Sequence, residues 1–241
     1  MPIDLLLAAA TAWTLPKDPP IKPGGLAVLH RTLTRGAKRI ELDIARFDTK
    51  AYTLRVVDNK DGTRDLPVAM AAAKCVAGVN GGYFHADRSP LGLVIADGKT
   101  LHREQVDSGL LTGIVTASPG RFDIWRVAEF PKRRLPAQAL QVGPFLVDHG
   151  LIVKGLEATR AARRTAVVTD GKGLGALLAC DSLTLAEFAE LLATPGVVPG
   201  VVITRALNLD GGSSTMFYAA KPSTYRPGLA SVRNYLGIMP R

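Results

Sequence analysis

The chain contains 241 residues, 47% of them hydrophobic and 21% charged, which excludes an intrinsically disordered protein. Its 24 glycines and 16 prolines favour short strands and turns over a helical bundle. Thirty Lys and Arg residues against 21 Asp and Glu residues give a formal net charge of +9, which favours anionic partners. No apolar run approaches the roughly 18 residues of a membrane-spanning helix, so we expect no transmembrane segment.

The first 16 residues resemble a shortened export signal. The apolar core Leu5–Ala10 is followed by small residues, but Asp4 stands where a positive charge is usual. The segment is therefore either a remnant of an export signal, which would place the protein in the periplasm or outside the cell, or an ordinary N-terminal segment. A Pro-rich stretch follows as far as Gly25, so we expect residues 1–25 to precede a single domain at 26–241.

Hydrophobic periodicity predicts a chain built mainly of strands. Strands are expected at 39–45, 52–57, 76–79, 206–209, 215–219 and 232–238. Turn signals predict hairpins over 91–100, 110–127, 140–153 and 165–179. Helices are expected in the Ala-rich segment 66–74 and from Leu185, where Thr184 and Glu187 form a capping box. The sequence therefore predicts an α+β (mixed α/β) fold: a single domain with a strongly curved, hairpin-rich, multi-stranded sheet and few helices.

The two cysteines, Cys75 and Cys180, belong to no paired Cys motif, so a zinc site is not expected. We expect both to be buried free thiols. The alternative is one long-range disulfide, which would indicate an oxidising compartment. The four histidines are scattered and form no motif with cysteines or carboxylates. The sequence therefore predicts neither a metal site nor another cofactor.

Two Gly-Gly loops follow short apolar strands. One reads Asn80-Gly81-Gly82-Tyr83 and the other Asp210-Gly211-Gly212-Ser213-Ser214. Glycines at a strand end let backbone N–H groups point at an anion and let a ligand approach closely. The neighbouring Asn and Asp side chains can contact hydroxyl groups or act as bases. Structural turns explain many Gly-Gly pairs, and neither loop matches a nucleotide-binding motif.

The order of these loops resembles the phosphodiester glycosidase family. The matching segments are VNGGYFHADRSPLGLVI at 79–95, GP at 143–144, RT at 164–165, the predicted helix TLAEFAELL and the string ALNLDGGSSTMFY, and they extend over roughly residues 30–238. Tyr83 stands where the family frequently has Phe. The resemblance implies that residues 26–241 form a phosphodiester glycosidase-like domain. It also implies hydrolysis of a sugar-1-phosphodiester at the C1–O bond, which releases the sugar and a phosphomonoester.

Asp210 is the first candidate for the carboxylate that such a reaction needs. A phosphate ester leaves readily and needs little protonation, so one carboxylate that activates water or attacks C1 can be sufficient. Glu41 and Asp43 are the second candidates, because strand alternation places both on one face. Structural alternatives remain for all three: Asp210 can form an Asp-Gly turn, and Glu41 and Asp43 can form a solvated strand face.

Arg164 is the first candidate for a phosphate ligand, because a guanidinium binds phosphate oxygens through two parallel hydrogen bonds. A surface ion pair is the alternative. Asn80 and the Gly81 and Gly82 amides are candidates for binding phosphate or sugar, and His85 either lines the site or lies in a surface turn. The other expected substrate-binding residues are Tyr83, Gly143, Thr165, Gly211, Gly212, Ser213 and Ser214.

Three functions compete for this sequence. The first is a hydrolase of a phosphate-bearing carbohydrate, such as a bacterial phosphoglycan or exopolysaccharide; the second is a non-catalytic phosphoglycan-binding domain of the same fold. The intact carboxylate and Arg set favours the enzyme, with Asn80, Gly82, Arg164 and Asp210 converging on one cleft. A nucleic-acid-binding domain would interleave aromatic and basic residues. The two Trp, five Tyr and seven Phe show no such pattern, so no nucleic-acid partner is expected. Oligomeric state is left open.

Overall fold

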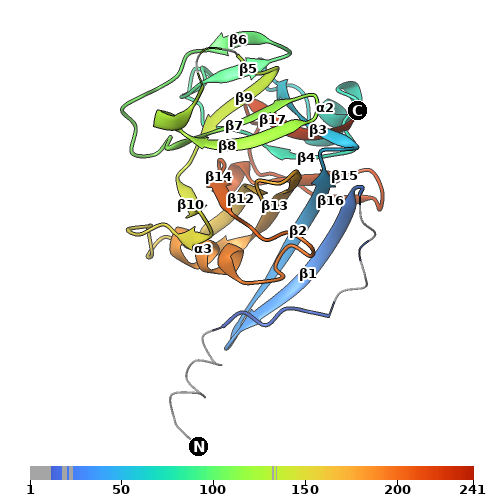
Figure 1. Cartoon of the computed structure of the whole chain (residues 1–241), viewed down its shortest axis with the longest axis vertical. Coiled ribbons are helices and arrows are strands. Elements are labelled where there is room, and N and C mark those ends of the chain that lie inside the picture. The colour runs from blue at the N-terminus through green and yellow to red at the C-terminus, as the bar shows by residue number, and fades with distance from the viewer. Residues whose placement is uncertain (1–11, 18–20, 22–23, 132, 134) are drawn as a thin grey trace, which may run out of the picture.

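The computed structural model describes residues 12–17, 21, 24–131, 133 and 135–241, and three antiparallel sheets dominate it (Figure 1). The apolar core of the predicted export signal lies outside the described residues. No helix in the described part of the chain is long and apolar enough to cross a membrane.

The first sheet has seven strands in the order β1-β2-β13-β12-β14-β10-β11. These strands are β1 (Ala27–Arg35), β2 (Lys38–Asp48), β13 (Leu174–Leu183), β12 (Ala162–Thr169), β14 (Arg205–Asn208), β10 (Phe145–Asp148) and β11 (Leu151–Ile152). The second sheet has the order β16-β15-β4-β17-β3, with β16 (Thr224–Arg226), β15 (Phe217–Ala219), β4 (Ala77–Asn80), β17 (Asn234–Pro240) and β3 (Tyr52–Asp58). The third has the order β6-β5-β9-β7-β8, with β6 (Lys99–His102), β5 (Val94–Ala96), β9 (Gln138–Val142), β7 (Gly113–Ser118) and β8 (Arg121–Arg126).

The expected predominance of strands and scarcity of helices is confirmed, but the prediction of one strongly curved sheet is wrong. Strands that are distant in the sequence pair with one another, which divides the strands among three sheets. In the second sheet β4 pairs with β15 and β17, and in the first β2 pairs with β13. Periodicity within a strand reports which face is buried and not which strand lies beside it.

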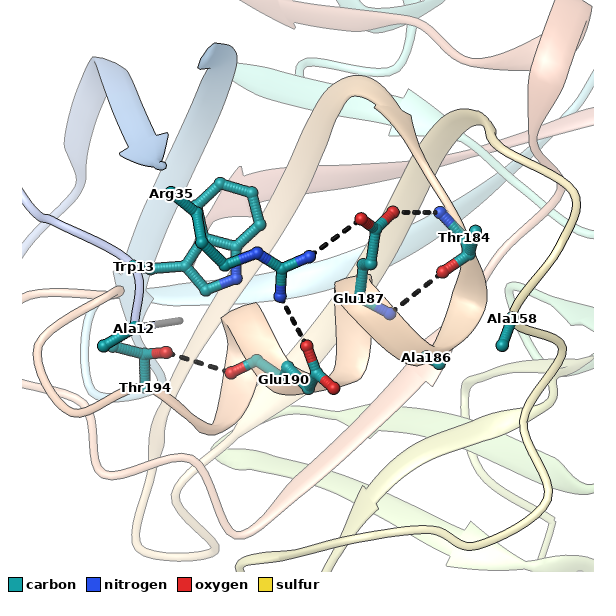
Figure 2. Close-up of a pocket in the computed structure, with 9 residues that line it drawn as sticks. All are labelled: Ala12, Trp13, Arg35, Ala158, Thr184, Ala186, Glu187, Glu190 and Thr194. Carbon is teal, nitrogen blue, oxygen red and sulfur yellow. Dashed lines mark hydrogen bonds and ion pairs between the residues drawn. The ribbon is translucent and has the colours of Figure 1, made fainter. Parts of the chain in front are cut away.

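Two α-helices are present among the described residues, both where the sequence predicts them: α2 (Leu66–Ala72) and α3 (Leu185–Ala193). The predicted capping box begins α3. The Thr184 hydroxyl accepts a hydrogen bond from the Glu187 N–H at 3.1 Å, and the Thr184 N–H donates to the Glu187 carboxylate at 3.0 Å (Figure 2). Two of the free N–H groups at the helix start thereby gain acceptors. Short 3₁₀ turns occur at η1 (Val127–Glu129) and η2 (Gly212–Ser214).

The first sheet lies between two apolar layers. The side chains Ile40, Leu42 and Ile44 of β2 pack with Phe188 and Leu191 of α3 on one face. The other face packs against the second and third sheets in a core whose members include Phe47, Leu177, Leu207, Leu54, Val79, Val115 and Leu140. Alternation along β2 thus serves two layers, and it turns Glu41 and Asp43 away from α3.

Most predicted hairpins form, and one does not. The Asp97-Gly98 turn joins β5 to β6, and the loop at 170–173 joins β12 to β13. The predicted hairpin over 140–153 is wrong in its first half, because Leu140 belongs to β9 in the third sheet while β10 and β11 pair in the first. The chain crosses between the two sheets at Gly143 and Pro144. Cys75 and Cys180 are free and buried, as expected, so the disulfide alternative is wrong.

Candidate functional site

The two Gly-Gly loops meet where the first and second sheets adjoin. The loop after β4 begins at Gly81, and the loop after β14 carries Asp210. The Asp210 N–H donates to the Gly81 carbonyl at 3.1 Å, and the Asn80 Nδ2 donates to the Asp210 carbonyl at 2.6 Å. Loops that are about 130 residues apart in the sequence are therefore joined by two direct hydrogen bonds.

Asn80 is the central polar residue of this junction. Its side chain is completely buried. While Nδ2 donates to Asp210, Oδ1 accepts from the Thr165 hydroxyl at 2.8 Å and from the Met216 N–H at 3.1 Å. The amide therefore connects β4, β12 and both ends of the Asp210 loop. Asn80 and Thr165 are both expected to bind substrate, but their side-chain polar atoms are hydrogen-bonded within the protein. These bonds hold the Asp210 loop in place.

Asp210 is partly exposed, and its carboxylate is held by its own loop. The Gly211 N–H donates to Oδ1 at 2.8 Å, and the Ser214 side chain is a second hydrogen-bond partner. Burial raises the pKa of Asp210 above its ordinary value, and these hydrogen bonds offset part of that rise. A carboxylate of raised pKa in a partly exposed loop has the character required of a general base.

Tyr83 lies beside Asp210 in a second polar junction. The Tyr83 hydroxyl is within hydrogen-bonding distance of the Gly143 carbonyl at 2.8 Å and the Leu209 carbonyl at 3.1 Å, and it accepts from Asn208 Nδ2 at 2.8 Å. Burial raises the pKa of Tyr83, and the negative charge of Asp210 raises it further. The phenol therefore stays neutral and connects the Gly143 corner to the chain immediately before Asp210.

Gly143 is required at this corner by close packing. A Cβ atom there would lie 2.1 Å from the Leu110 carbonyl oxygen and 2.8 Å from the Thr112 nitrogen. The Gly143 carbonyl is then free to accept from both Tyr83 and Asn208. Asn208 was not singled out as a site residue in the sequence, although it lies within the string that carries the family resemblance.

Arg164 is brought near Asp210, but two of its three guanidinium nitrogens are already engaged. Its Nε donates to the Leu183 carbonyl at 2.7 Å and its Nη2 to the Arg160 carbonyl at 2.8 Å, with Glu157 3.9 Å away. The remaining nitrogen, Nη1, lies 4.0 Å from where a Cβ on Gly211 would stand. Because the Gly211 N–H bonds Asp210, this guanidinium and the carboxylate lie within about 10 Å of each other.

The glycine amides differ in their availability. Both amides of the first loop are occupied, since the Gly81 N–H donates to the Asn234 carbonyl at 2.9 Å and the Gly82 N–H to Asn234 Oδ1 at 2.8 Å. A Cβ on Gly81 would lie 2.0 Å from that same Oδ1, which explains the glycine. The sequence predicts these amides as ligands of phosphate or sugar. In the structure they are instead bonded to Asn234 and hold the strands together.

The second loop is more open. Gly212 has φ +63°, a backbone conformation that favours glycine, and a Cβ there would meet no atom within 4 Å. Ser213 is exposed, whereas Ser214 is buried against Asp210. Of the predicted ligands in these two loops, Gly212 and Ser213 are therefore the most accessible.

Glu41 and Asp43 form a separate charged cluster on β2. Asp43 is buried, with Oδ1 2.6 Å from His30 Nδ1 and Oδ2 accepting from Arg226 Nε at 2.6 Å. Glu41 lies 3.2 Å from His30 Nε2 and also accepts from the Thr32 hydroxyl. Among the described residues, no hydrogen bond or ion pair joins this cluster to Asp210. The solvated strand face offered as the alternative holds in part for Glu41 and is wrong for Asp43.

His85 is exposed and lies in a turn in which its N–H donates to the Ser89 carbonyl and its carbonyl accepts from the Arg88 N–H. The described residues contain no group of three His, Cys, Asp or Glu side chains arranged to hold a metal ion. Sequence could not have identified the His30 partner of Asp43 or its Arg226 partner, because strand pairing and not spacing brings them together.

A large open cavity lies elsewhere, between the N-terminal segment and α3 (Figure 2). Arg35 stacks over the Trp13 ring at 4.7 Å and pairs with Glu187 at 2.8 Å and Glu190 at 2.5 Å. Both carboxylates that line this cavity are thus paired, and Glu187 also pairs with Lys38 at 2.7 Å. None of the residues predicted to act on substrate lines it.

Comparison with known proteins gives a family and a fold. The model of the family described as Phosphodiester glycosidase matches residues 73–239, more than half of the chain. No curated protein sequence matches significantly. Among solved structures, the zebrafish N-acetylglucosamine-1-phosphodiester alpha-N-acetylglucosaminidase catalytic domain, auto-inhibited by its pro-peptide, is similar with a TM-score of 0.66 at 16% identity, over 98% of this chain and 91% of that one.

Two bacterial structures are also similar. A hypothetical protein from Synechocystis has a TM-score of 0.62 at 17% identity, over 90% of this chain and 62% of that one. A putative exported protein from Burkholderia pseudomallei has a TM-score of 0.53 at 13% identity, over 88% of this chain and 74% of that one. At these identities the likeness concerns the fold.

Proposed function

The chain belongs to the phosphodiester glycosidase family, and from that premise we propose that it hydrolyses a sugar-1-phosphodiester at the C1–O bond. The products are the free sugar and a phosphomonoester. The observation that carries this proposal is the placement of the half-buried Asp210 carboxylate within about 10 Å of the free Nη1 of Arg164. One group can act at C1 while the other holds the phosphate.

Asp210 acts at the sugar carbon in this mechanism. Water attacks C1, the C1–O bond breaks, and its electron pair leaves with the phosphate oxygen. The ionised Asp210 either accepts the proton of the attacking water or stabilises the positive charge that develops at C1. Burial moves the pKa of Asp210 upward and so towards neutral pH, where a base is most effective. The leaving phosphomonoester needs little protonation, so a second carboxylate is not required.

Arg164 holds the leaving group through Nη1. Its other two nitrogens are bonded to main-chain carbonyls, which fixes the plane of the guanidinium before substrate arrives. Gly212 and the exposed Ser213 belong to the Asp210 loop and are placed to contact the sugar or phosphate. Tyr83 and Asn80 act on neither group directly in this proposal, and they keep the Asp210 loop in position.

The decisive assay incubates the protein with a panel of sugar-1-phosphodiesters in oxygen-18 water and identifies the products by mass spectrometry. Label in the sugar indicates C–O cleavage, and label in the phosphate would contradict the proposal. Asp210→Asn should lower kcat by about 10²- to 10⁴-fold, the scale for loss of a general base. Asp170→Asn is the matched control, because Asp170 also begins an Asp-Gly turn and accepts two loop N–H groups.

A non-catalytic phosphoglycan-binding domain is the second candidate, because Arg164, fixed by its two main-chain carbonyls, can hold a phosphate through Nη1 whether or not Asp210 acts at C1. It predicts that the native chain binds a phosphoglycan without turnover and that Asp210→Asn binds it equally well. Turnover that is lost in Asp210→Asn would exclude it.

We further propose that the substrate is a bacterial phosphoglycan or exopolysaccharide, reached in the periplasm or outside the cell. The net charge of +9 supports an anionic polymer. The similarity in fold to a putative exported protein from Burkholderia pseudomallei agrees with this location. Fractionation of cells that express the native gene tests the location, and protein found only in the cytoplasm would refute it.

A further inference from the structure

We infer that Arg163, the neighbour of the predicted phosphate ligand, is an anion-binding residue at the rim of the Asp210 loop. Its ligand is an oxyanion of the phosphate type. The inference rests on the proposed function for the identity of that anion, but not for its binding. Arg163 belongs to no motif that the sequence resemblance rests on.

The charge balance around the site separates Arg163 from the arginines near it. Arg226 is bonded to Asp43 at 2.6 Å and to Asp181 at 2.7 Å. Arg164 has its two carbonyls and Glu157. Arg163 makes one hydrogen bond, from Nη2 to the Pro227 carbonyl at 2.8 Å. Among the described residues, no Asp or Glu oxygen lies within 4 Å of its guanidinium.

The guanidinium of Arg163 lies in a partly buried position near a second cation. Arg163 is partly buried, and burial, followed by the positive charge of Arg226, lowers its pKa. Asp181 and Asp43 act in the opposite direction, but both are already hydrogen-bonded to Arg226. A cation that has lost part of its hydration without gaining a counter-ion is the protein half of an anion site.

Arg163 is also tied to the candidate site on two sides. Its carbonyl oxygen lies 2.9 Å from where a Cβ on Gly211 would stand. Its guanidinium holds Pro227, the first residue of a short segment whose Leu229 and Ala230 N–H groups both donate to the Ser213 carbonyl, at 2.7 and 3.1 Å. Arg163 is therefore bonded to the segment, residues 227–230, that is itself hydrogen-bonded to the exposed Ser213.

These contacts leave the guanidinium able to bind an oxyanion. Nη2 is directed to Pro227 by one bond, so the remaining N–H groups of Arg163 are available to two oxygens of a phosphate. Arg163 and Arg164 are consecutive on β12, and their side chains follow different paths, one to Pro227 and the other to Leu183. An incoming phosphate ester meets the more exposed Arg163 at the rim and Arg164 beyond Gly211.

The test measures binding of inorganic phosphate to the native chain and its variants by titration calorimetry, with no turnover required. Arg163→Gln should weaken phosphate binding by about tenfold, the value of one charge-assisted contact. Arg163→Lys keeps the charge but loses the planar guanidinium, so its phosphate affinity should lie between those of the native chain and Arg163→Gln. Arg121→Gln is the matched control, since it removes the same charge from an exposed position on β8.

The outcomes are distinguishable. Native-like phosphate affinity in a folded Arg163→Gln protein, or equal losses in Arg163→Gln and Arg121→Gln, would refute the inference, as would absence of phosphate binding by the native chain. If Arg163→Gln fails to fold by circular dichroism, the Arg163→Lys result decides, and native-like affinity there would refute the bidentate contact. Phosphate binding that depends on Arg163 in a protein without hydrolase activity would leave the inference standing and refute only the proposed function.

Discussion

Replacing Asn80 should damage the Asp210 loop more than any neighbouring polar substitution. The Asn80 amide is completely buried and makes three hydrogen bonds, to the Asp210 carbonyl, the Thr165 hydroxyl and the Met216 N–H. In Asn80→Ala all three groups lose their partner at once. A buried polar group without a partner costs about 1–3 kcal/mol. The Thr165 hydroxyl can rotate to another acceptor, so we expect a total loss of about 3–5 kcal/mol in the free energy of unfolding.

Thr165→Val provides the comparison. It removes one of the three bonds and leaves Asn80 Oδ1 with the Met216 N–H as its donor. Because valine introduces no unsatisfied polar atom, the cost should be about 1 kcal/mol. Ser213→Ala, at an exposed hydroxyl in the same loop, should change stability by less than about 0.5 kcal/mol.

Urea unfolding followed by circular dichroism measures all three values on one scale, and each kcal/mol should correspond to about 2–4 °C in a thermal melt of a chain of this size. An Asn80→Ala variant no less stable than Thr165→Val would show that the three bonds do not act together. It would also remove the reason for treating Asn80 as the support of Asp210.

Three further outcomes are expected. Burial raises the pKa of Asp210, so its stabilising contribution is present at acid pH and is lost as the pH rises through the raised pKa; Asp210→Asn should therefore gain stability relative to the native chain on going from about pH 3 to about pH 8, and thermal melts showing an unchanged difference would contradict this. Arg164→Ala should raise KM for a phosphodiester, in a manner that added salt partly mimics, and should also destabilise the fold by about 1–3 kcal/mol because the buried Leu183 carbonyl loses its donor; Arg160→Ala, at an exposed side chain, should do neither. Burial raises the pKa of Cys75 and Cys180 to about 12, so neither thiol should react with a thiol reagent until the protein unfolds, and a reductant should leave the Tm unchanged; rapid labelling of the native chain would show that one of them is accessible.

Local features of the fold could be predicted because their causes lie within a few residues. The capping box of α3 needs only Thr184 and Glu187, three positions apart. The Asp97-Gly98 turn fixes the β5–β6 hairpin in the same way. The division into three sheets depends instead on which buried strand faces which. The apolar sequence of β4 does not indicate which strands pair with it, and only the structure shows that these are β15 and β17.

The candidate site shows the same limit in its polar residues. The string around Asp210 identified the loop, and strand-end glycines identified its meeting with Gly81. Neither feature could indicate that the Thr165 hydroxyl donates a hydrogen bond to the Asn80 side chain. A side chain's hydrogen-bonding capacity is a property of its type, but whether that capacity is free for a ligand depends on partners from other strands.

The consecutive arginines on β12 make this difference concrete. By type they are identical, and the resemblance singles out Arg164 because it stands before Thr165. The β12 strand is irregular at this point, with a register shift between Ala162 and Arg164, and the two guanidinium groups meet different surroundings. Arg164 reaches Leu183 and Arg160 and keeps one nitrogen free, whereas Arg163 reaches Pro227 and lacks a counter-ion. How much each guanidinium gains from a phosphate ester depends on these partners, and two of them, Leu183 and Pro227, come from segments that lie apart from both arginines in the sequence.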